Sequence, residues 1–156
     1  MRNILALLTV LLLPMSAYSL DLVLRAVVPD EVTYVGTDEH TLLSYTIPGG
    51  TVTDGYQWNF KFPVMSDTPN GISGTRIYCG ANYFEFNRPD PEIVGRLDGY
   101  IQIRPGYCFV AIGNTEYNQI PRPDFGEDVT IKMTWVGGGS IAYITLQNGW
   151  LEEIQP

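Results

Sequence analysis

The chain has 156 residues, of which 9 are basic and 17 acidic, so its formal net charge is -8. Such an acidic surface repels phosphate backbones, and no cluster of Lys and Arg offsets it, which excludes a nucleic-acid partner. The single histidine, His40, excludes metal sites built from several histidines. Any Ser-His-Asp catalytic triad would also have to run through this one residue.

Residues 1–19 have the pattern of a secretory signal peptide. Arg2 gives a positive start, an apolar run extends from Ile4 to Leu13, and the small residues Ala17 and Ser19 precede the expected cleavage site. The run is shorter than the roughly 20 residues that cross a bilayer, and no later segment is longer, so no membrane span is expected. We predict a single mature domain, residues 20–156, in a secreted or periplasmic location.

The mature chain opens with an alternating strand, residues 20–28. Leu20, Leu22, Leu24 and Ala26 occupy every second position and therefore share one face of this strand. A short apolar segment follows at residues 32–35. A third predicted strand, residues 40–47, ends at the turn Pro48-Gly49-Gly50.

Residues 56–62 form the clearest strand in the sequence. Tyr56, Trp58, Phe60 and Phe62 alternate with polar residues, so the four rings lie on one face. Each ring buries about 150–250 Å², which favours a position at the centre of the core. An exposed platform that stacks on sugars is the alternative. We expect Pro63 to end the strand, because proline lacks the amide donor that pairing requires.

The remaining strands follow at short intervals. Residues 74–86 are interrupted by Gly80, residues 97–104 and 107–112 are joined by Pro105-Gly106, and residues 113–127 have little periodicity. Residues 129–135 and 141–146 are separated by three glycines, which predicts a hairpin. Eight or nine short strands with turns between them predict an all-β fold, a single antiparallel β-sandwich, with a small barrel as the alternative.

The two cysteines, Cys79 and Cys108, lie in apolar, strand-like stretches of an exported chain. An even pair in an oxidising compartment usually forms a disulfide. The spacing differs from that of a redox motif, and no lysine or histidine lies nearby to lower a thiol pKa. We therefore predict a structural bond between two core strands.

Carboxylates gather in two predicted loops, Asp90 with Glu92, and Asp124 with Glu127 and Asp128. Paired carboxylates serve glycosidases as acid and base, and the second group offers hard oxygens that suit Ca²⁺. Both groups lie among prolines and glycines, where charge commonly belongs to a solvated loop. No catalytic residue, cofactor or metal site is therefore predicted, and Asp124, Glu127 and Asp128 remain a weak calcium candidate.

Aromatic residues in irregular stretches and at strand ends are the better candidates for contact with a partner. A tyrosine or tryptophan at such a position has an apolar body and a polar tip. The candidates are Tyr83, Tyr107, Tyr117, Phe125 and Trp150.

The run from Gly139 to Leu146, followed by Trp150, resembles the C-terminal strand of bacterial chaperone-usher pilus subunits. There a glycine precedes an Ala-x-Val-Thr-Phe-like alternation, and an aromatic residue lies near the end. This resemblance implies an incomplete immunoglobulin-like sandwich that is completed by a strand donated from the next subunit. Leu20, Leu22, Leu24 and Ala26 would then be the donated side chains or an ordinary first strand.

Three functions follow from these observations. The resemblance implies an exported structural or adhesive subunit of a bacterial surface fibre, whose partners are like subunits or a surface receptor. The second is a self-contained secreted binding module for a protein or carbohydrate ligand. The third is a small secreted hydrolase that uses loop carboxylates. We expect a binding protein rather than an enzyme.

Overall fold

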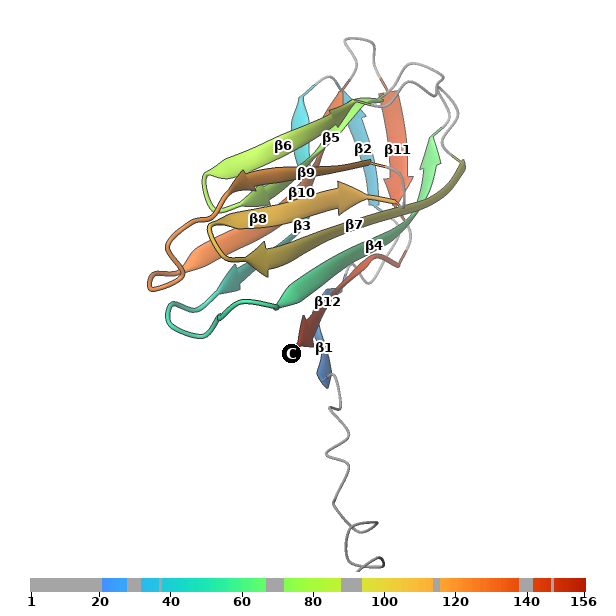
Figure 1. Ribbon diagram of the computed structural model, residues 1–156. Helices are drawn as coiled ribbons and strands as arrows, with labels where there is room; N and C mark the ends of the chain where they lie inside the picture. The colour runs from blue at the N-terminus through green and yellow to red at the C-terminus, as the bar shows by residue number, and fades with distance from the viewer. Residues whose placement is uncertain are drawn as a thin grey trace, which may run out of the picture.

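The computed structural model describes residues 21–27, 32–36, 38–66, 72–87, 94–113, 116–137, 142–146 and 148–156. These residues form twelve strands and no helix, arranged in two antiparallel sheets (Figure 1). The predicted all-β sandwich is confirmed, with more strands than the eight or nine expected. The predicted signal peptide and Leu20 lie outside the described residues. Across the described ranges, no helix is long and apolar enough to cross a membrane.

The larger sheet contains eight strands. Its main path is β1 (Asp21–Val27), β12 (Trp150–Gln155), β4 (Gln57–Ser66), β7 (Val94–Arg104), β8 (Tyr107–Ile112) and β9 (Glu116–Pro121). The last residues of β4 pair instead with β11 (Ala142–Leu146), which also pairs with β2 (Val32–Gly36). In Figure 1, β2 and β11 stand beside the upper end of β4.

The smaller sheet has four strands in the order β3 (Glu39–Ile47), β10 (Val129–Gly137), β5 (Ile72–Cys79) and β6 (Asn82–Asn87). The two sheets approach each other at both sides of the sandwich. β6 lies beside β9, where the Asn82 amide donates to the Pro121 carbonyl at 3.1 Å, and β1 lies beside β3.

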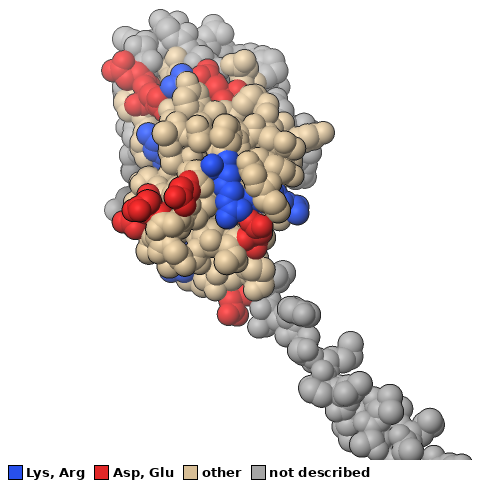
Figure 2. Space-filling model, turned by 60° about the vertical axis from the view of Figure 1, so that its left-hand side comes forward, with Lys and Arg blue, Asp and Glu red and all other residues tan. Residues whose placement is uncertain are grey.

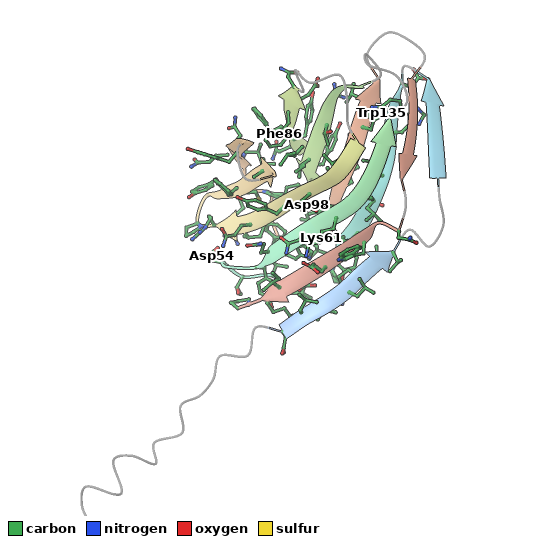
Figure 3. All side chains as sticks on the ribbon, turned by 90° about the vertical axis from the view of Figure 1, so that its right-hand side faces the viewer. Asp54, Lys61, Phe86, Asp98 and Trp135 are labelled. Carbon is green, nitrogen blue, oxygen red and sulfur yellow. The ribbon has the colours of Figure 1, made fainter. Side chains whose placement is uncertain are left out.

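The core lies between the sheets and is centred on β4. Trp58, Phe60 and Phe62 are 0% exposed, so the alternation that predicted a buried aromatic face is confirmed. Phe86 and Trp135 of the smaller sheet are also buried (Figure 3). The prediction that β4 ends at Pro63 is wrong, because the strand continues to Ser66 and Pro63 is still paired in register with β7. Proline is tolerated here because it lies where pairing with β12 stops and pairing with β11 begins.

The first strand presents its leucines to solvent. Leu22 is 62% exposed and Leu24 is 57% exposed, whereas Ala26 packs against the core. The expectation that these residues share one face is wrong, because a bulge between Leu24 and Ala26 shifts the register by one residue. Arg25 lies at the bulge, and its side chain is partly buried.

The predicted hairpin between residues 129–135 and 141–146 is also wrong. β10 belongs to the smaller sheet and β11 to the larger one, so the chain changes sheets between them. A hairpin is impossible because β3 and β5 already occupy both edges of β10.

The interruption expected at Gly80 and the tight turn expected at Pro105-Gly106 are both confirmed. Gly80 connects β5 to β6 with a φ of 65°, and Gly106 connects β7 to β8 with a φ of 79°. Glycine suits both positions because positive φ strains residues that carry a Cβ. In contrast, residues 113–127 are not wholly irregular, since they contain β9.

Cys79 of β5 and Cys108 of β8 meet across the core. Both are 0% exposed, and their Sγ atoms lie 3.1 Å apart as two thiols in contact. The hydrogen bond with Cys108 and burial raise the pKa of Cys79. The two predicted strands are therefore juxtaposed, and the bond itself remains a prediction.

Candidate functional site

Three aromatic side chains form a patch on the outer face of the larger sheet. Tyr100 lies on β7, Phe109 on β8 and Tyr117 on β9. The Tyr100 and Phe109 ring centroids are 5.7 Å apart, and those of Phe109 and Tyr117 are 5.5 Å apart. The ring planes of the two pairs differ by only 32° and 24°. We call these three residues the aromatic patch.

Strand periodicity places the aromatic patch outside the core. On β8, Cys108 and Val110 are 0% exposed and face inward, so Phe109 between them faces outward. Tyr100 precedes the buried Ile101 in the same way. Tyr117 is 70% exposed, the largest exposure among the exposed large hydrophobic residues of the described chain.

Strand register gathers the patch around a small residue. Ala111 pairs with Tyr100 on one side and with Tyr117 on the other. Ala111 has a short side chain and is only 1% exposed, so the larger side chains around it cover it. Phe109 lies two residues before Ala111 on β8, where it contacts both tyrosines diagonally.

Amide side chains border the aromatic patch. Gln102 and Gln119 pair with Phe109 from its two neighbouring strands. The Gln102 carbonyl oxygen accepts a hydrogen bond of 2.8 Å from Arg104. Burial raises the pKa of Tyr100, so its hydroxyl stays protonated and able to donate at neutral pH. The patch thus combines apolar ring surface with neutral hydrogen-bonding groups.

A polar network continues the same outer face on β4 and β12. Glu152 is 6% exposed and accepts hydrogen bonds from Lys61, from Asn59 at 3.0 Å and from the Trp150 indole at 3.2 Å. Burial raises the pKa of Glu152, but the hydrogen bonds from Lys61, Asn59 and Trp150 outweigh burial and hold this pKa below its ordinary value. In Figure 3, Lys61 on β4 and Asp98 on β7 lie on adjacent strands, where they are paired in register. The charges of Lys61 and Glu152 in this network pair with each other.

The outer face of the smaller sheet carries a second cluster. Arg76 donates to Glu39 at 2.6 Å and to Glu85 at 2.8 Å, and its guanidinium lies 5.0 Å from the centre of the Tyr83 ring. Glu39 also accepts a hydrogen bond of 2.6 Å from Tyr78. These charges satisfy one another, and Tyr83 is 47% exposed. The polar groups of this cluster are therefore hydrogen-bonded to one another, and its tyrosine is less exposed than Tyr117 of the aromatic patch.

Asp124 and Asp128 have local structural roles, while Asp90 and Glu92 lie outside the described residues. Asp124 accepts a hydrogen bond from the Gly126 amide at 2.8 Å, and Asp128 accepts one from the Gly49 amide at 2.9 Å. Within the described part of the chain, no three His, Cys, Asp or Glu side chains lie close enough together to hold a metal ion. Asp124, Glu127 and Asp128 are therefore not assembled as a calcium site. His40 stacks on Trp135, with ring centroids 5.2 Å apart.

The predicted contact residues separate into different environments. Tyr117 belongs to the aromatic patch and Tyr83 to the opposite face, while Trp150 is half-buried beside Lys61. Phe125 is 5% exposed and belongs to the core, so its prediction as a surface contact is wrong. The Arg122 side chain lies over Phe125, with its guanidinium carbon 5.5 Å from the centre of the Phe125 ring.

Two residues of the patch, Tyr100 and Phe109, were missed as candidates. Phe109 carried a usable signal, because it occupies the outward position of a strand whose inward positions are filled by Cys108 and Val110. Which residues of β7 and β9 lie beside Phe109 depends on strand register, and the sequence of a single strand does not reveal this register.

No family model matches this chain, and no curated protein matches it. The solved structures that it resembles include the A. japonicus protein CB05, with 6% identity over 88% of this chain and 26% of that one, and a TM-score of 0.40. This chain therefore spans about a quarter of that protein's length. A second is the CBM2 module of the evolved Dit of Lactobacillus casei BL23 phage J-1, with 9% identity over 72% of this chain and 69% of that one, and a TM-score of 0.38. A third is the lectin UEA-II complexed with galactose, with 12% identity over 84% and 85% of the two chains and a TM-score of 0.38. At these scores, an assignment of function has to come from the side chains of this chain.

Proposed function

We propose that this protein is an exported β-sandwich module that binds carbohydrate on the outer face of its larger sheet. The observation that carries the proposal is the aromatic patch, in which Tyr100, Phe109 and the 70% exposed Tyr117 lie side by side. Rings placed inside a core explain stability, but this cluster lies on the opposite side of the sheet from the core.

The chemistry of the patch suits a sugar. The C–H faces of a pyranose ring are apolar and pack against aromatic rings, while its hydroxyls need neutral donors and acceptors. Gln102 and Gln119 supply such groups on both sides of Phe109. A rigid sheet holds the rings in place, so little side-chain freedom is lost on binding.

The distribution of charge favours a neutral ligand. Figure 2 shows acidic and basic side chains interspersed over one face of the molecule, without a large area of one sign. The acidic net charge of -8 adds no attraction for acidic polymers. We therefore propose neutral polysaccharide as the ligand, and binding rather than catalysis as the activity, since Asp124 and Asp128 hold loop backbone.

A binding assay tests this proposal. The mature protein is mixed with insoluble cellulose, chitin, xylan and mannan, and the protein that remains in solution is measured. We expect at least one of the four to retain the wild type, and Tyr117→Ala to remain in solution. Failure of all four to retain the wild type, or equal retention of the two proteins, contradicts the proposal.

Assembly into a surface fibre is a second candidate function, favoured by the exposed apolar side chains of β1. This strand lies at the edge of the larger sheet, with Leu22, Leu24 and Val27 each at least 50% exposed. Exposed apolar edges promote pairing between chains. Assembly predicts that the purified mature protein forms oligomers and that Leu22→Thr with Leu24→Thr makes it monomeric. A monomeric wild type at high concentration argues against assembly without affecting the carbohydrate proposal.

A further inference from the structure

A pocket of about 170 Å³ opens at the side of the sandwich where β1 lies beside β3. Its polar lining comes from three strands and the segment between β3 and β4, and comprises Arg25, Tyr45, Thr51, Tyr56, Glu153 and Gln155. The aromatic patch lies on other strands, β7 to β9, so the pocket is a separate feature.

The bulge in β1 brings Arg25 into this pocket. The Arg25 Nε donates to the Glu153 Oε2 at 2.5 Å, and Gln155 donates to the Glu153 Oε1 at 3.0 Å. Glu153 is 4% exposed, and both of its oxygens are hydrogen-bonded. The carboxylate therefore fixes the orientation of the guanidinium and has no need of a further donor.

The remaining donors of Arg25 are available to a ligand. Among the residues that the structure describes, neither terminal nitrogen of Arg25 has a hydrogen-bond partner, and neither do the hydroxyls of Tyr45 and Tyr56. The Tyr45 ring lies 5.5 Å from the guanidinium carbon, which supports the planar group on one side. The Arg25 side chain is 30% exposed, so the pocket is reached from solvent.

We propose that this pocket binds the carboxylate group of a small ligand. The two terminal nitrogens of an arginine form a fork that matches the two oxygens of a carboxylate. Glu153 offsets the charge of Arg25, and the whole chain is acidic, so a singly charged anion is favoured over a dianion such as phosphate. A volume of about 170 Å³ fits a single small unit, such as one sugar acid or a short organic acid.

The experiment follows backbone and arginine side-chain NMR signals of the full mature protein during titration. The probes are acetate, which carries the carboxylate alone, D-glucuronate, which adds a sugar ring, D-glucose, which lacks the carboxylate, and phosphate. We expect acetate and D-glucuronate to shift the Arg25 Nε signal and neighbouring amides, and glucose to leave them unchanged. Tighter binding of D-glucuronate than of acetate identifies a sugar acid as the source of the carboxylate, and equal binding identifies a simple organic acid. An Arg25 signal unmoved by both carboxylates, or moved equally by glucose or phosphate, overturns the proposal.

Two variants separate binding from folding. Arg25→Lys keeps a positive charge for Glu153 but removes the fork, so we expect about tenfold weaker carboxylate binding or more. The matched control is Arg104→Lys, which alters an exposed arginine outside the pocket and should leave binding unchanged. Tyr56→Phe removes only a hydroxyl from the pocket. If Arg25→Lys fails to fold, the test uses Tyr56→Phe instead, and we expect folded Tyr56→Phe to bind carboxylates more weakly than the wild type. Wild-type affinity in Arg25→Lys, or in a folded Tyr56→Phe when Arg25→Lys does not fold, rejects the site.

Discussion

The ring of Tyr117 lies 5.5 Å from the ring of Phe109, with the two planes 24° apart, although Tyr117 is 70% exposed to solvent. An exposed tyrosine loses little contact area when it is removed, so its contribution to stability is small. The pairing of the two rings therefore creates surface that is available to a partner, and binding is separable from folding in variants of Tyr117.

Replacement of Trp58 by alanine should destabilise the protein strongly. The Trp58 side chain is 0% exposed at the centre of the core, and removal of a buried aromatic ring typically costs about 3–5 kcal/mol. Chemical denaturation of Trp58→Ala and of the control Tyr117→Ala measures the difference. We expect less than about 0.5 kcal/mol for the control. Similar losses in both variants would contradict the assigned positions of the two rings.

Oxidation of Cys79 and Cys108 should stabilise the exported protein. Their sulfurs already lie 3.1 Å apart across the two sheets, so little movement is needed to form a bond. Closing the loop between these residues should stabilise the fold by roughly 3–4 kcal/mol. Mass spectrometry of the secreted protein reports the bond, and denaturation with and without reductant reports its effect. Two free thiols in the secreted protein, or equal stability in both conditions, would refute this prediction.

Acid should remove the stabilisation that Glu152 provides. The folded pKa of Glu152 lies below its ordinary value of 4.5, so its contribution is complete above that pH and is lost as the pH falls through the folded pKa. We expect Glu152→Gln to be about 1–3 kcal/mol less stable than the wild type at pH 7, because Lys61 loses its charged partner. The difference should shrink below pH 4.5.

Unfolding free energies measured from pH 7 to pH 3 give this comparison. Glu127→Gln serves as the control, because its side chain is exposed in a loop and its replacement should change stability little. A constant difference between Glu152→Gln and the wild type across the whole range would mean that the charge of Glu152 has no linkage to folding.

The elements that were predicted well have a strong local pattern. β4 alternates rings with polar residues, and the turns at Gly80 and Gly106 require a residue that tolerates positive φ. The core position of Trp58 follows directly from this alternation.

The elements that were missed depend on the rest of the fold. β12 contains two adjacent glutamates, and a sequence pattern gives no reason to bury them. Their burial becomes favourable only because Lys61 and Arg25 arrive from other strands. The exposure of Leu22 and Leu24, in contrast to Ala26, likewise depends on pairing with β12 and on the bulge in β1.

The candidate site was predictable only in part. The sequence predicts Tyr117 as a contact residue but not its neighbours Tyr100 and Phe109, because strand register alone brings the three together. The Arg25 pocket was missed for a similar reason. Its residues come from segments far apart in the chain, and a bulge turns Arg25 toward them.

The affinity of Tyr117→Ala for the polysaccharide that retains the wild type tests the central claim most directly. Isothermal titration with a soluble oligosaccharide of that polymer should show binding weakened about tenfold or more, with the unfolding free energy unchanged. Tyr83→Ala, a partly exposed tyrosine on the other sheet, should bind as the wild type does. Wild-type affinity in a folded Tyr117→Ala would contradict the assignment of the aromatic patch as the carbohydrate site.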